Sequence, residues 1–471
     1  MAPVGSVGRA LVAGFALLFA ACGKDLAGPA NADAPRIGTA TVSASSHNSL
    51  ALIVSVGVTN ADSAGVRFHL EEELLAQDSV TPPVQIVGDS AVIPVLGLLP
   101  GRSYTLSAVA YWEGGSVVGG PVRITTDTLP SDLPRYAVSR TDASPGYVVF
   151  AAGAYGLVID NTGRVVWYRR FPEGPGLNFM AQPNGRYAAR PTTTDPTDVE
   201  SWLEIDPVGN VTRTLGCGRG LQPRFHDLIT ERDGGYWLMC DEPRTIDLSA
   251  SGGVARAVVS GTAVQHVGAA GELLFHWSPF DHFAITDLDS AERAGANVNW
   301  THGNSLDLDT DGNLIVSFRN LGELTKIHSV TGAVIWRMGG RRNEFTFPDS
   351  PSPPYARQHG VRVAAPGTLL ILDNVGNPAE SRAERYTVNE GARTARLSHS
   401  YGSTPGVVTL IGGSVQSLAG GRTLVTFGTA GRVEEYDASG RVVWRIEGNA
   451  GYVFRAQRIR SLYAPGAGTT R

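Results

Sequence analysis

Short runs of alternating apolar and polar residues recur along most of the chain, with turn residues between them. From residue 136 onward one pattern returns six times: a turn glycine followed by apolar residues that end in Trp or Leu, at intervals of 46 to 62 residues. The glycines are Gly163, Gly209, Gly271, Gly332, Gly391 and Gly440. A repeat of this length built from four short strands is typical of propeller blades. The pattern therefore predicts a six-bladed β-propeller over residues 135–465, closed by pairing of residues 452–463 with strands near residues 136–159.

A separate set of short strands precedes the repeats, in residues 35–130. Alternating runs at residues 50–58, 65–71, 90–95, 104–112 and 121–126 are separated by turn signals at the spacing of a β-sandwich. The passage GLLPGRSYTLSAVAYWEGGSVVGGPVRITTDTLP resembles the last strands of a fibronectin type III module. Such modules usually space, dock or dimerise an enzyme, so a homodimer is one expectation, and no chemistry is assigned to this domain.

Composition agrees with an all-β protein. The 471 residues include 57 Gly and 28 Pro, and few runs have helical periodicity. The net charge is -5, and Lys and Arg are scattered without a basic stripe. Nucleic acid is therefore excluded as an expected partner.

The first 22 residues have the pattern of an export signal. Arg9 precedes an apolar run over residues 10–21, and Cys22 follows Leu-Phe-Ala-Ala, which resembles a bacterial lipoprotein signal ending in a lipobox. The alternative is an ordinary signal peptide cut near Ala21. We expect an exported protein with a lipid on Cys22, anchored at the periplasmic face of the outer membrane, and residues 23–34 as a flexible tether.

Export places the two remaining cysteines, Cys217 and Cys240, in an oxidising compartment. A disulfide between them would stabilise the fold by about 3 kcal/mol. Two free buried thiols are the other interpretation, because sequence does not give the separation of their Cα atoms.

Three histidines occupy equivalent places in successive repeats. They are His226, His302 and His359, each followed by a short apolar strand and a turn. Arg319 ends the second strand of the repeat that contains His302. Residues at the ends of innermost propeller strands gather at the central channel, so these four side chains are predicted to form one functional cluster.

The segments around this cluster resemble a known family. HGNSLDLDTDGNLIVSFRN, IWRMGGRRNEFTF, ARQHGV and LLILDN follow one another as in the bacterial arylsulfotransferases that need no nucleotide sulfate donor. The resemblance covers residues 136–463. It implies a six-bladed propeller, preceded by a small β domain, that moves a sulfuryl group from an aryl sulfate to a phenol.

The same resemblance implies roles for five residues. His359 matches the position that becomes sulfated, while His302 and Arg319 match residues that hold the sulfate and assist proton transfer. His226 would add a further contact, on fewer matching neighbours, and Asn304 would lie close to the substrate. No cofactor is implied.

Physical chemistry is compatible with these roles. A neutral imidazole is nucleophilic near pH 7 without a separate base. Arg319 and a protonated histidine would hold the peripheral oxygens of a loose transition state. His302 would protonate the leaving phenolate and then accept the proton of the incoming phenol, giving a ping-pong scheme through a sulfohistidine.

Other interpretations compete with this one. Asp307, Asp309 and Asp311 resemble the start of a calcium loop, but Phe318 stands where a bidentate Glu is required, which favours a polar turn. Zinc on three histidines is opposed by the neighbouring Arg319, so no metal is expected. A lipid-tethered propeller that binds a ligand or partner without turnover is the alternative function. Four aromatic residues would either line the substrate mouth or belong to the core: Trp202, Tyr236, Trp300 and Tyr355.

Overall fold

The computed structural model describes residues 35–72, 78–171, 178–191, 201–350, 354–376 and 379–466. The predicted signal peptide, Cys22 and the tether lie outside these residues. In the described ranges α1 (Ser290–Arg293) is the one α-helix. Nowhere in these ranges does a helix have the length and apolar character needed to span a membrane. Short 3-10 helices occur at Ser249–Ser251, Pro279–Asp281, Ile285–Asp287, Ala419–Gly421 and Gly428–Ala430.

The N-terminal strands form two packed sheets. The first sheet contains β1 (Arg36–Ile37), β2 (Thr41–Ala44), β3 (Ala51–Thr59) and β7 (Ser90–Leu96). The second contains β4 (Ser63–Leu70), β5 (Ser79–Val80), β6 (Val84–Gln85), β8 (Ser103–Trp112) and β9 (Gly115–Thr125). Buried side chains from β3 and β7 share one core cluster with those from β4 and β8, which makes this unit a β-sandwich. The resemblance to fibronectin type III stays a prediction.

The remaining described strands form six sheets, here called blades A to F, in which all pairs are antiparallel except β20 with β22. Blade A contains β35 (Ala456–Ile459), β11 (Tyr147–Ala152), β12 (Tyr155–Ile159) and β13 (Val165–Arg170). Blade B contains β14 (Asn178–Ala181), β15 (Tyr187–Arg190), β16 (Trp202–Ile205) and β17 (Val211–Leu215). Blade C contains β18 (Gln222–Thr230), β19 (Tyr236–Ile246), β20 (Ala257–Val267), β21 (Leu273–Trp277) and the added β22 (Asn297–Asn299).

The other three blades follow in chain order. Blade D contains β23 (Gly303–Leu308), β24 (Leu314–Phe318), β25 (Glu323–Ile327) and β26 (Val334–Gly339). Blade E contains β27 (His359–Ala365), β28 (Thr368–Asp373), β29 (Arg382–Asn389) and β30 (Thr394–Gly402). Blade F contains β31 (Ser414–Ser417), β32 (Thr423–Phe427), β33 (Arg432–Tyr436), β34 (Val442–Ile446) and β10 (Val138–Arg140). The six blades confirm the predicted all-β propeller.

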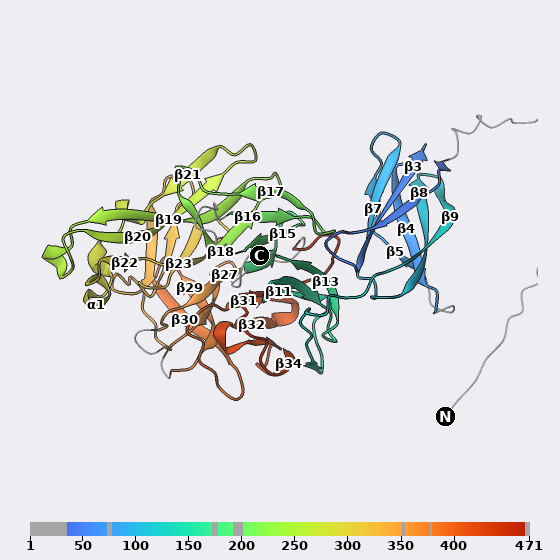
Figure 1. Ribbon diagram of the computed structural model, residues 1–471. Coiled ribbons are helices and arrows are strands. Elements are labelled where there is room, and N and C mark those ends of the chain that lie inside the picture. Colours follow the sequence, from blue (N-terminus) through green and yellow to red (C-terminus); the bar gives the residue numbers. More distant parts are fainter. Residues whose placement is uncertain are drawn as a thin grey trace, which may run out of the picture.

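The first strand of each blade faces a common centre. One cavity is lined by residues of β14, β18, β23, β27 and β31, together with Ala456 and Gln457 of β35. Figure 1 shows β18, β27, β31 and β11 near the middle of the ring, with β21, β22 and β34 at the rim. Side chains from distant parts of the sequence therefore meet at this centre.

Both ends of the propeller sequence close the ring. β35 pairs with β11, with Ile459 opposite Tyr147, and β10 pairs with β34, with Val138 opposite Ile446. The predicted closure by the C-terminal segment is thus present. It adds a strand to the inner edge of β11 and to the outer edge of β34, so neither edge is left open.

The six repeated glycines mark one turn of each blade. Each lies between the third and fourth strands counted from the centre, as Gly332 does between β25 and β26. The tryptophans that follow are on the fourth strands and are almost fully buried; they are Trp167, Trp277, Trp336 and Trp444.

The burial pattern of some inner strands differs from the prediction. A strand that alternates apolar and polar residues would leave every second side chain of β24 exposed, yet all five residues are buried. The reason is that neighbouring blades pack on both faces of a blade, so its inner strands have no solvent face.

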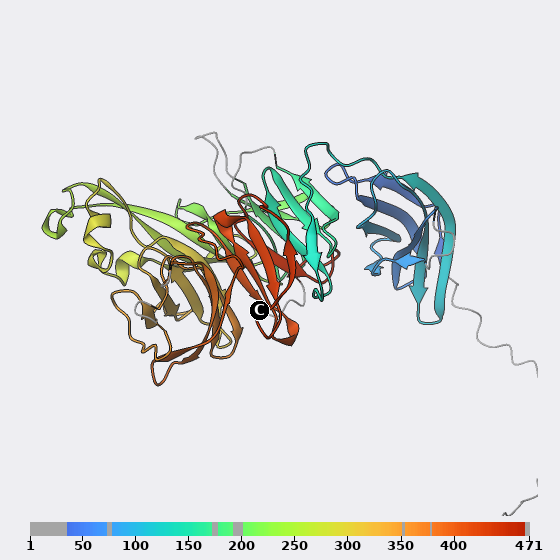
Figure 2. The same cartoon turned by 90° about the horizontal axis from the view of Figure 1, so that it is seen from below.

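The sandwich contacts one edge of the propeller. Ser45 Oγ donates to the Val208 carbonyl at 2.7 Å, and the Leu96 N–H donates to the Tyr463 hydroxyl at 3.2 Å. Figures 1 and 2 place the sandwich at the side of the propeller and α1 at the opposite end. The sandwich is therefore remote from α1 and the loops around it.

Candidate active site

The three predicted histidines lie on consecutive blades, at one end of the innermost strands. His226 is within β18, His302 immediately precedes β23, and His359 begins β27. The rings of His226 and His302 have their centroids 5.1 Å apart in an edge-to-face arrangement. Arg319 follows β24 directly, and its charge lowers the pKa of both His302 and His359. The structure thus brings the four residues together.

Each of these strands loses regular pairing at its histidine. The register of β18 shifts between Pro223 and Leu228, that of β23 between Gly303 and Ser305, and that of β27 between His359 and Arg362. β-bulges of this kind redirect side chains and are common next to active sites. At these bulges the side chains no longer alternate strictly between the two faces of the strand, so the three histidines can point toward one another.

His359 is held by two acceptors at Nδ1. Its Nδ1 lies 2.8 Å from Asn374 Oδ1 and 3.0 Å from the Arg357 carbonyl, so the ring proton is on Nδ1. The Gly412 N–H points at Nε2 from 3.4 Å. Nε2 therefore carries the lone pair, and the ring is only 1% exposed.

The orientation of the Asn374 amide is fixed by its own contacts. Its Nδ2 donates to the carbonyls of Thr409 (2.9 Å) and Gly412 (3.0 Å), which leaves Oδ1 facing His359. One side chain thereby connects His359 to the loop that supplies the Gly412 N–H. Asn374 is part of the Asp-Asn element noted in the sequence, but its contact with His359 was not predicted.

His302 presents the opposite tautomer. Asn299 Nδ2 donates to its Nδ1 at 2.6 Å, which places the ring proton on Nε2. The residue has a left-handed backbone, with φ of 47°, and the Arg319 N–H donates to its carbonyl at 3.1 Å. The cluster therefore contains one imidazole with its lone pair on Nε2, His359, and one with its N–H on Nε2, His302.

Arg319 is held by neutral oxygens. Its Nη1 donates to Asn320 Oδ1 at 3.0 Å and its Nη2 to the Leu410 carbonyl at 3.2 Å. Within the described part of the chain, no carboxylate forms an ion pair with it. Its positive charge is thus available to an anion.

Asn304 is buried beside the cluster. Its Nδ2 donates to the Gln358 carbonyl at 2.6 Å, and its Oδ1 accepts from Ser305 Oγ at 3.4 Å. This contact holds the backbone next to His359. The predicted contact of Asn304 with substrate stays a prediction.

The surroundings keep all three histidines neutral. Burial, followed by the charges of Arg224 and Arg319, lowers the pKa of His302 to about 2. Burial also lowers the pKa of His359 to about 4, although the hydrogen bond to Asn374 opposes the shift. The pKa of His226 is lowered well below its usual value, chiefly by burial. A protonated histidine beside Arg319, as expected from the sequence, therefore does not fit the structure: these rings act as neutral donors and acceptors.

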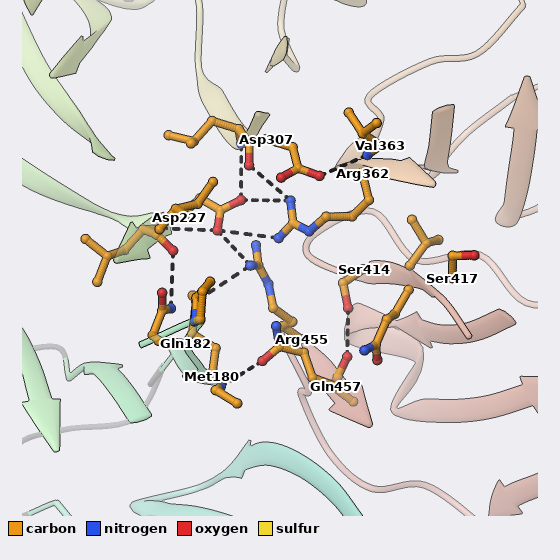
Figure 3. Close-up of a pocket in the computed structure, with 18 residues that line it drawn as sticks. Met180, Gln182, Asp227, Asp307, Arg362, Val363, Ser414, Ser417, Arg455 and Gln457 are labelled. Carbon is orange, nitrogen blue, oxygen red and sulfur yellow. Dashed lines mark hydrogen bonds and ion pairs between the residues drawn. The ribbon is translucent and has the colours of Figure 1, made fainter. Parts of the chain in front are cut away.

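An ion network fills the channel next to the histidines (Figure 3). Asp227 accepts from Arg362 Nη1 at 3.0 Å, from Arg455 Nη1 at 2.7 Å and from the Leu306 N–H at 3.1 Å. Arg455 Nη2 also donates to the His226 carbonyl at 3.2 Å. One carboxylate thus connects four innermost segments. The sequence gives no signal for this network, because its residues are far apart in the chain.

The predicted aromatic residues divide into two groups. Trp202, Tyr236 and Trp300 are buried in the core. Tyr355 is also buried but borders a hollow lined by Arg319 and Arg357.

The aspartates that resemble a calcium loop already have a cationic partner. Lys326 Nζ contacts Asp309 at 2.7 Å, Asp311 at 2.8 Å and Glu390 at 2.7 Å. This supports the polar turn over a metal site. In the described ranges there is no group of three or more His, Cys, Asp or Glu side chains arranged to hold a metal ion.

Cys217 and Cys240 form a disulfide, with their Cα atoms 6.2 Å apart. Cys217 follows blade B and Cys240 is on β19 of blade C. The bond therefore joins neighbouring blades.

Comparison with known families adds to this geometry. Residues 223–449 match the model of the arylsulfotransferase family. This part of the chain is similar to that family. The match contains His226, His302, Asn304, Arg319 and His359. The arylsulfotransferase match supports aryl sulfotransfer, with small phenolic substrates, as the general class of activity.

The other comparisons give distant likenesses. No curated protein matches the chain. A Bacteroides caccae protein of unknown function is 13% identical, with a TM-score of 0.45, covering 68% of this chain and 100% of its own. A streptogramin B lyase is 12% identical, with a TM-score of 0.38 and coverages of 68% and 85%. Virginiamycin B lyase from Staphylococcus aureus is 10% identical, with a TM-score of 0.36 and coverages of 67% and 90%.

Proposed function

We propose that this protein transfers a sulfuryl group from a phenolic sulfate ester to a phenol, through a sulfohistidine at His359. The observation that carries the proposal is the pair of opposite tautomers. His359 offers a lone pair at Nε2, His302 offers an N–H at Nε2, and the unpaired charge of Arg319 lies beside both.

In the first half-reaction His359 Nε2 attacks the sulfur of the donor. The N–S bond forms as the S–O bond to the aryl oxygen breaks, and the electron pair of that bond leaves with the phenolate. His302, which binds a second proton from solvent once the anionic donor is in place, donates its Nε2 proton to the phenolate oxygen and becomes a neutral ring again. The bound sulfate ester brings a negative charge beside His302, which raises its pKa and favours the ring as a proton carrier.

In the second half-reaction a phenol attacks the sulfur of sulfohistidine. Its oxygen forms the new S–O bond, the N–S bond breaks, and the electron pair returns to His359 Nε2. The phenol proton passes to His302, which restores the starting state. Each half uses the same site, so donor and acceptor bind in turn.

Charge in the transition state develops on the peripheral sulfuryl oxygens. Arg319 is the fixed cation that stabilises them. Preorganised donors of this type are the main source of catalysis in related group transfers.

The test is a two-substrate assay with 4-nitrophenyl sulfate as donor and phenol as acceptor. We expect release of nitrophenol that depends on phenol, and at least a thousandfold loss in His359→Ala, on the scale of losing a covalent nucleophile. Mass spectrometry of the protein mixed with donor alone should show one added sulfuryl group on His359.

A matched control is His399→Ala, which removes a histidine outside the cluster. Its circular dichroism and activity should equal those of the unchanged protein. A folded protein that stays inactive across several donors and phenols would contradict the proposal and favour the non-catalytic binding propeller.

We also propose that the protein is exported and lipid-anchored through Cys22. The lipobox-like sequence and the Cys217–Cys240 disulfide, which is typical of oxidising compartments, support this. Membrane fractionation of the full chain and of Cys22→Ala tests it, and equal membrane retention of both would contradict the anchor.

A further inference from the structure

Two arginines at the edge of the cluster share one acceptor. Arg319 Nη1 and Arg357 Nη1 donate to the same Asn320 Oδ1, at 3.0 Å and 2.9 Å. Two guanidinium groups this close repel each other: burial first and then the charge of Arg357 lower the pKa of Arg319. An anion placed between them would relieve this repulsion.

The arginines line a hollow rather than a packed surface. Its other lining residues include Asn320, Val375 and Leu410, which give it a mixed polar and apolar wall. Apolar walls suit an aromatic ring, and a guanidinium group suits a carboxylate, which it can bind through two parallel hydrogen bonds.

The backbone carbonyl of Arg357 contacts the His359 ring, while the side chain of Arg357 points away from that ring. Arg357 has a left-handed φ of 56°, and its carbonyl accepts from His359 Nδ1 at 3.0 Å. Its side chain instead reaches Asn320 and Glu292. The residue is thus next to the proposed nucleophile, with its cation in the hollow.

The charges in the hollow do not cancel. Arg357 pairs with Glu292 of α1, while the hydrogen bonds of Arg319 go to neutral oxygens. The Arg357–Glu292 pair is about one-third exposed on both sides, and ion pairs with this exposure contribute little to stability. A substrate anion can therefore replace Glu292 at low cost.

We propose that Arg357 binds a second negative charge of the substrate, so that the preferred phenols carry a carboxylate on the aromatic ring or on a short side chain. Arg319 serves the sulfuryl group and Arg357 serves the carboxylate. Glu292 occupies Arg357 until substrate binds. This inference rests on the proposed sulfotransfer and names its substrate class.

The experiment compares 4-hydroxyphenylacetate with its methyl ester as acceptors, using 4-nitrophenyl sulfate as donor. The two phenols differ in charge and little in shape. We expect kcat/KM for the acid to exceed that for the ester by about tenfold, the scale of one charge-assisted hydrogen bond.

Three variants test whether the preference for the acid over the ester depends on Arg357. Arg357→Gln should reduce the acid-to-ester ratio to about one, and Glu292→Gln should raise the ratio because it frees Arg357. Arg341→Gln is the control: it removes a nearby exposed arginine that pairs with Asp289, and it should leave the ratio unchanged. Equal losses for both acceptors in Arg357→Gln, or a ratio of one in the unchanged protein, would overturn the proposal.

Calorimetry separates this proposal from the proposed function. 4-Hydroxyphenylacetate is titrated into His359→Ala and into His359→Ala with Arg357→Gln. Binding that requires Arg357 without any sulfotransfer by the unchanged protein would contradict the reaction and keep the anion site. Transfer to neutral phenols without such binding would contradict the anion site alone.

Discussion

At the scale of single residues, the environment of His359 decides when it can act. Its imidazole must be neutral at Nε2 to attack sulfur, and the buried position disfavours the imidazolium form. Asn374 supports the charged form through Nδ1, so its hydrogen bond limits the fall of the pKa to about 4.

This pKa predicts the acid limb of activity. Because the active form is deprotonated, kcat/KM should stay level from pH 8 to about pH 5 and fall by half near pH 4, the value given by burial and Arg319. Initial rates with 4-nitrophenyl sulfate, stopped in base before reading nitrophenol, measure this limb. Circular dichroism at each pH controls for unfolding, and a half-loss near pH 6.5, the value of a solvated histidine, would contradict the prediction.

The residue scale also shows what sequence could reveal. His226, His302, His359 and Arg319 were predicted because each has a local signal: a polar residue at a fixed place in a repeat. Asn374 and Asp227 lacked such a signal. The bond from Arg455 to Asp227 joins residues 228 positions apart, and only the closed ring brings them together.

At the scale of elements, the bulge at the start of β27 depends on Gly360. This glycine has φ of 63°, and a Cβ on it would lie 2.8 Å from Ser414 Cα of β31. Alanine there would force the innermost strands of blades E and F apart, next to the proposed nucleophile.

Gly360→Ala should therefore lose both stability and activity. We expect at least about 1–2 kcal/mol lower free energy of unfolding from the left-handed backbone alone, and a loss of kcat beyond tenfold because His359 moves. Gly312→Ala is the matched control, since Gly312 has φ of 80° but open space around its Cβ position. It should lose similar backbone stability with unchanged kcat, as measured by urea unfolding and the nitrophenol assay. Full activity in Gly360→Ala would contradict this account.

The bulges themselves could not be predicted from the sequence. The alternation of apolar residues indicates where strands lie, but a register shift depends on which neighbour supplies the missing contacts. At β23 the Gly303 N–H bonds to Thr262 Oγ1 of blade C at 2.9 Å, a contact that requires the assembled ring.

At the scale of the whole molecule, the repeat predicted six blades, and the C-terminal segment was predicted to pair with the first strands of the propeller. The period of the turn glycines was sufficient, because each blade repeats the same turn between its third and fourth strands. The contact between sandwich and propeller, through Ser45 and Tyr463, had no repeating signal and was missed.

The disulfide adds a covalent link between blades B and C beyond the backbone that connects them. Cys217→Ser with Cys240→Ser should lower the free energy of unfolding by about 3 kcal/mol, because the unfolded chain regains the freedom of a closed loop. Urea unfolding of the variant and of the unchanged protein, each with and without reductant, measures the difference. The reductant should affect only the unchanged protein, and equal midpoints for both proteins would contradict a stabilising role.

The closure of the ring makes the centre depend on the end of the chain. β35 and Arg455 follow blade F in the chain, yet β35 is the innermost strand of blade A, and Arg455 bonds to Asp227 and to the His226 carbonyl. A chain cut before residue 452 loses both, and β11 is left with an open edge that invites aggregation. Any variant without this segment would therefore lose the contacts of Arg455 with Asp227 and with the His226 carbonyl.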